Sequence, residues 1–144
     1  MQSKVRMLKI FGYILLAVLS ANILIMAFDR NGSVFDSIAG SLLVTSPLII
    51  NYLLLLPFKN INNEILTILF WGIAGAYIAN VMIATYFIYL FGLSVISEGT
   101  IGEGGGYWFL LTAAGAFKLS GVGIIVGVIL SSIYFLFRRT AKNV

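Results

Sequence analysis

Apolar residues occur along this chain in four long runs, which are separated by short polar segments. The runs extend over Ile10 to Phe28, Ile38 to Phe58, Ile65 to Leu93 and Tyr107 to Phe137. A helix needs roughly 20 apolar residues to cross the hydrocarbon core of a bilayer, and each run reaches or nearly reaches that length. Because the backbone in hydrocarbon must satisfy its own hydrogen bonds, the pattern predicts four transmembrane helices.

The composition supports a single membrane domain over residues 1–144. Hydrophobic residues make up 60% of the chain and charged residues only 10%, whereas a soluble domain carries about 25% charged residues. No polar stretch is long enough to form a second, soluble domain. The sequence therefore predicts an all-α integral membrane protein that is surrounded by the lipid bilayer.

Lysine and arginine predict the orientation of the four helices. They gather in the N-terminal tail, in the C-terminal tail and, as Lys59, between the second and third runs. The first loop holds Arg30 beside two aspartates, and the last loop holds Glu98 and Glu103 without a cation. Positively charged loops stay in the cytoplasm. We therefore expect an up-down-up-down bundle with both termini cytoplasmic, in the inner (plasma) membrane of a bacterium.

The residue types that are missing exclude several kinds of site. The chain contains neither cysteine nor histidine, so it lacks the usual ligands of haem, copper and structural zinc and the commonest general base. Its carboxylates are scattered, and no nucleophile–base pair can be assembled. We therefore expect neither an enzyme nor a cofactor or metal. The net charge of +4 comes from the ends of the apolar runs, which argues against a nucleic-acid partner.

Small residues at four-residue spacing predict how two of the helices pack. The third run carries Gly72 and Ala76, and the fourth carries the GxxxG pair Gly123 and Gly127. Such ridges allow helix backbones to approach closely in a membrane, where there is little hydrophobic drive between helices. Packing within one bundle is the favoured interpretation, and a homo-oligomer seam is the alternative.

Each run contains one strongly polar residue, and these are Asn22, Asn51, Asn80 and Lys118. Lys118 is the only charge inside any run, and an ionisable side chain at membrane depth is costly and usually has a partner or a task. With about 1.5 Å of rise per residue, Asn80 and Lys118 lie well inside the core. We expect an intramembrane polar cluster of Lys118, Asn80 and Asn22, with Asn51 separate and nearer the cytoplasm.

The surroundings of Lys118 allow two interpretations. Small residues flank it at helical spacing, namely Ala114, Gly115 and Gly121, which favours a lysine that faces protein or a water-filled crevice. In the alternative, the segment from Leu119 to Phe137 crosses the membrane alone. Residues 107–117 would then be interfacial or re-entrant, and Lys118 would extend to the headgroups at the outer surface.

A binding role within the membrane is the function that these features favour. The expected form is an accessory or regulatory subunit that contacts the helices of a membrane-protein partner. One alternative is an immunity protein that neutralises a pore-forming toxin in the bilayer. Some bacterial immunity proteins are similar in size and have four spans, a likeness of layout that no motif carries. A second alternative is a small oligomeric transporter with Lys118 as a solute or anion site.

Overall fold

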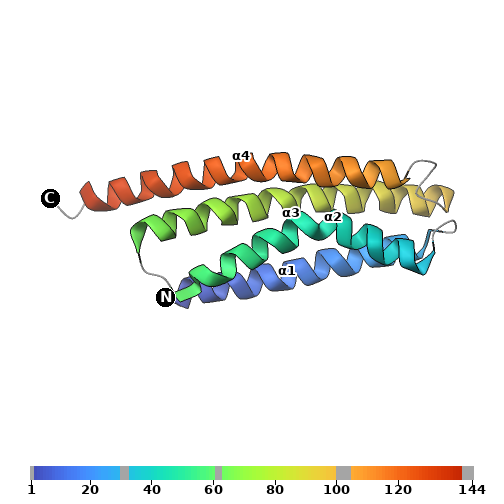
Figure 1. Ribbon diagram of the computed structural model, residues 1–144, viewed down its shortest axis with the longest axis horizontal. Helices are drawn as coiled ribbons and strands as arrows, with labels where there is room; N and C mark the ends of the chain where they lie inside the picture. Colours follow the sequence, from blue (N-terminus) through green and yellow to red (C-terminus); the bar gives the residue numbers. More distant parts are fainter. Residues whose placement is uncertain (1, 30–32, 61–62, 100–104, 141–144) are drawn as a thin grey trace.

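The described part of the chain is built from helices alone. The computed structural model describes residues 2–29, 33–60, 63–99 and 105–140. The four long helices and one short 3₁₀ helix are α1 (Gln2–Ala27), α2 (Val34–Leu55), η1 (Leu56–Asn60), α3 (Glu64–Glu98) and α4 (Gly105–Thr140) (Figure 1).

Four of these helical segments are long and apolar enough to cross a membrane. Their bounds are Ser3–Ala27, Ile38–Asn60, Glu64–Glu98 and Thr112–Arg138. This finding confirms the predicted all-α class and the four membrane-spanning candidates. The helices α3 and α4 have 35 and 36 residues, and both begin or end beyond the apolar runs. At about 1.5 Å per residue each exceeds the 30 Å or so of a hydrocarbon core, so both extend past it.

Local capping contacts set both ends of α3. The side-chain oxygen of Asn63 accepts hydrogen bonds from the backbone N–H groups of Ile65, at 2.9 Å, and Leu66. At the other end Gly99 takes the left-handed conformation with φ of 73°, and its N–H donates to the carbonyl of Val95. Asparagine at an N-cap and glycine at a C-cap are favoured for these reasons.

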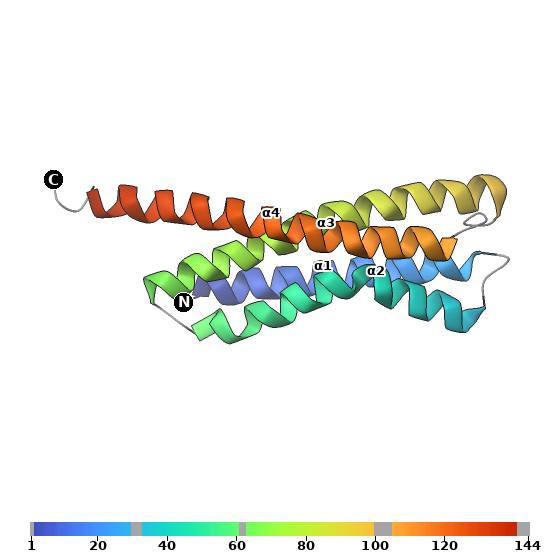
Figure 2. The ribbon, with the colours of Figure 1, turned by 45° about the horizontal axis from the view of Figure 1, so that its top comes forward.

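The helices form a bundle in which α3 and α4 share the most extensive contact. They lie side by side in both ribbon views, while α1 packs mainly on α2 and also touches α3 (Figures 1 and 2). The helix α2 contacts all three others, whereas α1 and α4 make no close backbone approach among the described residues. The start of α1 and the end of α4 lie toward the same end of the molecule (Figure 1).

Proline bends α2 without leaving its backbone unsatisfied. Pro47 lies inside the helix and cannot donate to the carbonyl four residues earlier, which belongs to Leu43. The hydroxyl of Ser46 donates to that carbonyl at 2.7 Å, and Thr45 donates to the carbonyl of Ser41 at 2.6 Å. Figure 2 shows that α2 changes direction near the middle of its length.

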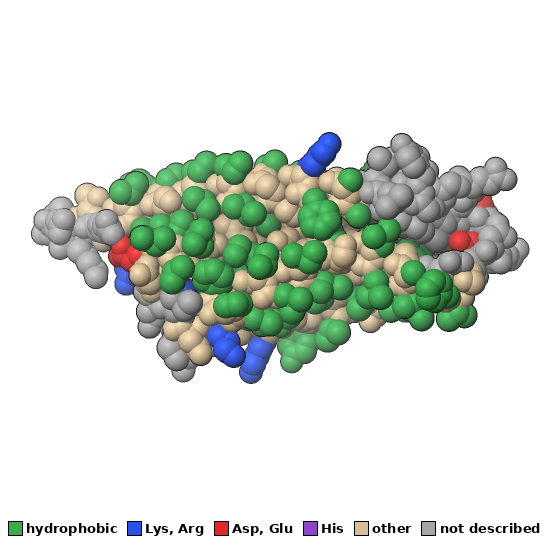
Figure 3. All heavy atoms as spheres, viewed as in Figure 1, with side chains coloured by type: hydrophobic (Ala, Val, Ile, Leu, Met, Phe, Trp, Pro, Cys, Tyr) green, Lys and Arg blue, Asp and Glu red, His purple; other side chains and the backbone are tan. Residues whose placement is uncertain are grey.

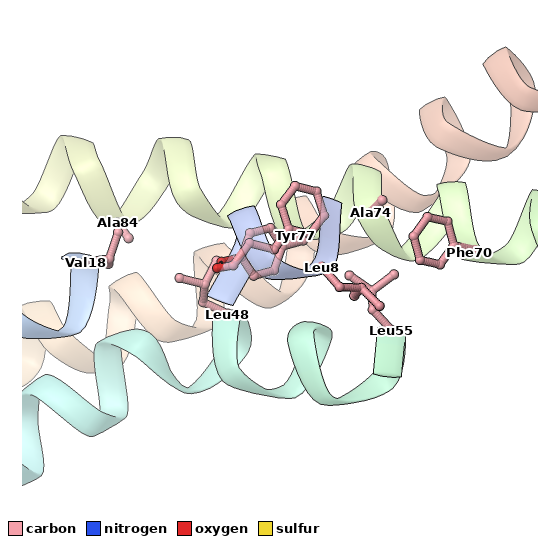
Figure 4. Close-up of a cluster of buried hydrophobic side chains, with 9 residues drawn as sticks. Leu8, Val18, Leu48, Leu55, Phe70, Ala74, Tyr77 and Ala84 are labelled. Carbon is pink, nitrogen blue, oxygen red and sulfur yellow. The ribbon is translucent and has the colours of Figure 1, made fainter. Parts of the chain in front are cut away.

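A buried cluster between α1, α2 and α3 fixes the register of α1 against α3 (Figure 4). Tyr77 is fully buried, stacks on Phe11 at 4.4 Å between ring centroids and donates its hydroxyl to the Phe11 carbonyl. Ala84 lies next to Val18 in Figure 4. A residue of α3 is therefore level with the residue about 66 positions earlier in α1. This correspondence gives the relative heights of residues along the bundle.

The contact between α3 and α4 is made by backbone against backbone. A Cβ atom added to Gly123 would lie 2.6 Å from the carbonyl oxygen of Gly75 and 2.7 Å from the Cα of Ala76. A Cβ atom on Gly127 would collide with the Trp71 carbonyl and lie 2.9 Å from the Cα of Gly72. No larger side chain fits there, and the two small-residue ridges face each other.

This packing predicts opposite outcomes for two glycines of α4. Gly127→Leu forces the helices apart and should lower the free energy of unfolding by about 2 kcal/mol or more, as overpacking does. Gly121→Leu should change it by no more than about 1 kcal/mol, because a Cβ atom there meets nothing within 4 Å and leucine has the higher helix propensity. Unfolding by SDS in mixed micelles, followed by tryptophan fluorescence, measures both. Equal losses would contradict the contact.

Candidate functional site

Three polar side chains from three helices meet in the interior. The amide nitrogen of Asn80 in α3 donates to the hydroxyl oxygen of Ser120 in α4 at 2.8 Å, and that of Asn51 in α2 approaches the same oxygen at 3.4 Å. Ser120 in turn donates to the carbonyl of Ala116 at 2.8 Å. All three side chains are buried. We call Asn51, Asn80 and Ser120 the polar triad.

The hydrogen-bonding capacity of Ser120 is fully used, whereas that of Asn80 is not. A serine hydroxyl has one proton and two acceptor positions, and the three contacts of Ser120 occupy all of them. The carbonyl oxygen of Asn80 is buried and has no hydrogen-bond partner among the described atoms. A buried acceptor without a donor costs about 1–3 kcal/mol. The polar triad can therefore join helices and accept one further donor, but it holds no acid, base or activated nucleophile.

Asn22 does not belong to this site, which corrects the predicted cluster. Its side chain is buried but donates to the carbonyl of Val18, one turn earlier in α1, at 3.1 Å. By the register of α1 against α3, Asn80 is level with Ile14, and Asn22 lies eight residues or about 12 Å farther along. The contacts of α1 are with α2 and α3 rather than α4.

Lys118 also lies apart from Asn80, and the reason is helical geometry. Successive residues are rotated by about 100°, so Lys118 points about 200° away from Ser120. Because Ser120 faces the interior, the Lys118 side chain is exposed on the outside of the bundle. It makes no hydrogen bond or ion pair within the part of the chain that the structure describes. Lys118 was expected to face protein or a water-filled crevice, but none of the described residues covers it.

The small residues around Lys118 face outward as well. Ala114 and Gly121 are exposed, and Gly115 is half-buried. A Cβ atom added to Gly115 or Gly121 would meet nothing within 4 Å. The helix α4 therefore has two faces with small residues, one of them covered by α3 and the other, around Lys118, covered by none of the described residues.

Along the bundle, Lys118 stands close to the middle. Ser120 is level with Asn80, which is level with Ile14 at the centre of α1 (Gln2–Ala27). Lys118 is two residues, or about 3 Å, from that level. It is therefore far from either end of α1, which favours the deep placement of Lys118 over the interfacial alternative.

An apolar groove runs between α3 and α4 beside this position. It has a volume of about 500 Å³ and is lined by residues that include Met82 and Tyr86 of α3 and Gly115 and Leu119 of α4. Met82 and Tyr86 are largely exposed at its border. Apolar clefts of this size suit hydrocarbon or the side chains of another helix.

Sequence reasoning missed Ser120 and Gly75 and separated Asn51 from the other polar residues. Ser120, Gly123, Gly127 and Ser131 follow one another at spacings of three or four, so the signal that places Ser120 on the packed face was present. Asn51 was separated because residue counts along single helices do not show how the helices are shifted against one another, whereas its amide reaches Ser120 across the bundle. Gly75 was overlooked because four-residue spacing from Gly72 leads to Ala76.

Removal of the Ser120 hydroxyl tests the polar triad. Ser120→Ala leaves two buried amides without their acceptor and should lower the free energy of unfolding by about 1 kcal/mol, within the range measured for hydrogen bonds between membrane helices. Ser132→Ala is the matched control, since Ser132 is only partly buried, and should change it little. The same unfolding titration measures both. An unchanged stability of Ser120→Ala would show that the polar triad does not hold the helices together.

No protein-family model matches this chain, and neither the curated proteins nor the solved structures give a match.

Proposed function

We propose that this protein is an accessory or regulatory subunit of a membrane complex and binds its partner through the outward face of α4. In this proposal the four helices cross a bacterial inner membrane up-down-up-down, with both termini in the cytoplasm. The basic residues of the two tails and Lys59 support this orientation. The common location of the start of α1 and the end of α4 also supports it (Figure 1).

The observation that carries the proposal is the exposed position of Lys118. With α1 crossing the bilayer, a residue level with the centre of α1 lies near the bilayer midplane. A lysine there costs about 2.5–3.5 kcal/mol even on the insertion scale that gives the smallest values. Its four-carbon stem is too short to carry the ammonium across about 15 Å of hydrocarbon to the headgroups. A partner that covers Lys118 offsets this cost.

The remainder of α4 is suited to such a contact. Only 11% of its most apolar stretch is buried, the smallest share among the four spans, which range up to 39% for α2. Large apolar side chains continue the outward face beyond Lys118, and they include Val122, Ile125 and Ile129. Figure 3 shows apolar side chains along the visible face, and one basic side chain projects from the edge along which α4 runs.

The two alternative functions relate to this proposal in different ways. An immunity protein would be the special case in which the partner is a pore-forming toxin. A transporter would need Lys118 to line a solute path, but within one chain its side chain faces away from the other helices that the structure describes. Helix–helix binding is therefore the function that these contacts support best.

Affinity purification from membranes at native expression level, in mild detergent, tests the proposal. We expect a stoichiometric partner with the wild type and with Lys118→Arg, which keeps the charge. We expect its loss with Lys118→Leu. Lys9→Leu is the matched control, because it removes the same charge from the exposed surface of α1, which does not contact α4 within the described residues, and should retain the partner. A wild-type protein that purifies alone, and instead supports solute flux in liposomes, would contradict the binding role.

A further inference from the structure

We propose that the partner segment facing Lys118 is a transmembrane helix of a different polypeptide, which carries an aspartate or glutamate at the level of the bilayer midplane. This inference rests on the proposed binding function and names the chemistry of the partner. It follows from three features of the molecule, namely the open space around Lys118, its unpaired charge and the positions of the acidic residues in this chain.

The first feature is the room for a second helix. The backbone of α4 is uncovered on both sides of Lys118, because Cβ atoms at Gly115 and Gly121 would meet nothing within 4 Å. At Gly123, by contrast, added Cβ atoms collide with the α3 backbone. Small residues permit helix axes to approach closely in membranes. A partner helix can therefore lie near enough to α4 for a short carboxylate side chain to reach the ammonium.

The second feature is the charge itself. The Lys118 ammonium has three donors, and none of the described residues accepts from them. A carboxylate at this position would neutralise the charge and accept a hydrogen bond of about 2.8 Å. In hydrocarbon the attraction between the two charges is weakened far less than in water. Hydroxyl or amide groups of a partner would satisfy the donors but leave the net charge in the membrane.

The third feature argues against a second copy of this chain as the partner. The acidic residues that the structure describes lie away from the level of Lys118, and they are Asp29, Asp36, Glu64 and Glu98. Glu64 begins α3, Glu98 ends it and Asp29 follows α1. Figure 3 shows acidic side chains only toward the two ends of the visible face. A central residue stays central whether two copies are parallel or antiparallel, so none of these four carboxylates in a second copy would lie opposite Lys118.

The rest of the outward face of α4 indicates which residue types the remainder of the partner helix should carry. The outward face of α4 continues with Val122, Ile125 and Ile129, and the apolar groove with Met82 and Leu119 adjoins it. A helix that is apolar apart from one acidic residue matches both the charge and this surface. The phosphate of a lipid drawn toward Lys118 by local thinning of the bilayer is the competing occupant.

Carbodiimide crosslinking in intact membranes tests the inference. Dicyclohexylcarbodiimide joins a carboxyl carbon to the lysine Nζ by an amide bond, and the elements of water pass to the reagent, which leaves as its urea. We expect mass spectrometry to find Lys118 joined to an aspartate or glutamate within an apolar segment of another polypeptide. Lys118→Arg should retain the partner without forming this link. Lys118→Met should lower the yield of partner at least tenfold.

A steric variant separates lost binding from lost folding. Gly121→Leu adds bulk beside Lys118 where the bundle itself is open, so it should release the partner while the free energy of unfolding stays nearly unchanged. Undiminished partner with Lys118→Met would overturn the inference and, with it, the proposed contact through Lys118 on the outward face of α4. A wild-type complex without the link to a carboxylate would overturn the inference and leave the binding function standing. A link between two copies, or a phospholipid in place of a second polypeptide, would also overturn it. A wild-type protein that captures no partner would overturn both.

Discussion

Backbone contact between α3 and α4 is the constraint on which the rest of the structure depends. Gly123 and Gly127 lie so close to the α3 backbone that no side chain can replace their hydrogens. This contact fixes the rotation of α4 about its own axis. Because residues two positions apart point to nearly opposite sides of a helix, the same rotation turns Ser120 inward and Lys118 outward. One packing contact thereby decides which of the two polar side chains is buried in the bundle and which is exposed.

The polar triad adds specificity to this packing. Hydrogen bonds between membrane helices are individually weak, about 0.6 kcal/mol on average, but Ser120 receives amides from two other helices at once. If α4 rotated or slid along its axis, the side-chain amides of Asn51 and Asn80 would both lose their acceptor. The hydrogen bond from Asn80 puts Ser120 level with Asn80, and the contact of Tyr77 with Phe11 puts Asn80 level with the centre of α1. That alignment, rather than any count along α4 itself, places Lys118 near mid-height of the bundle.

The sequence was sufficient to predict the four helices, because apolar run length responds directly to bilayer thickness. It also identified the glycine ridges of α3 and α4. It failed for the polar cluster, because counting residues along each helix does not show how the helices are shifted along one another. Asn22 lies too far along α1 to reach Asn80, whereas Asn51 lies close enough to reach Ser120. The small residues around Lys118 suggested burial, yet small residues equally mark an uncovered face. Only the rotation of α4 about its axis, which the packed bundle determines, shows whether these small residues are buried or exposed.

The central claim is that residue 118 lies outside the bundle near the bilayer midplane. Spin labels attached to cysteines that replace Lys118, Val122 and Ile125 in liposomes test it most directly, by their accessibility to oxygen and to a water-soluble nickel complex. The account predicts high oxygen and low nickel accessibility for all three, with the label at residue 118 deep in the hydrocarbon. A label at residue 118 that lies at headgroup depth, or that both reagents fail to reach, would contradict it.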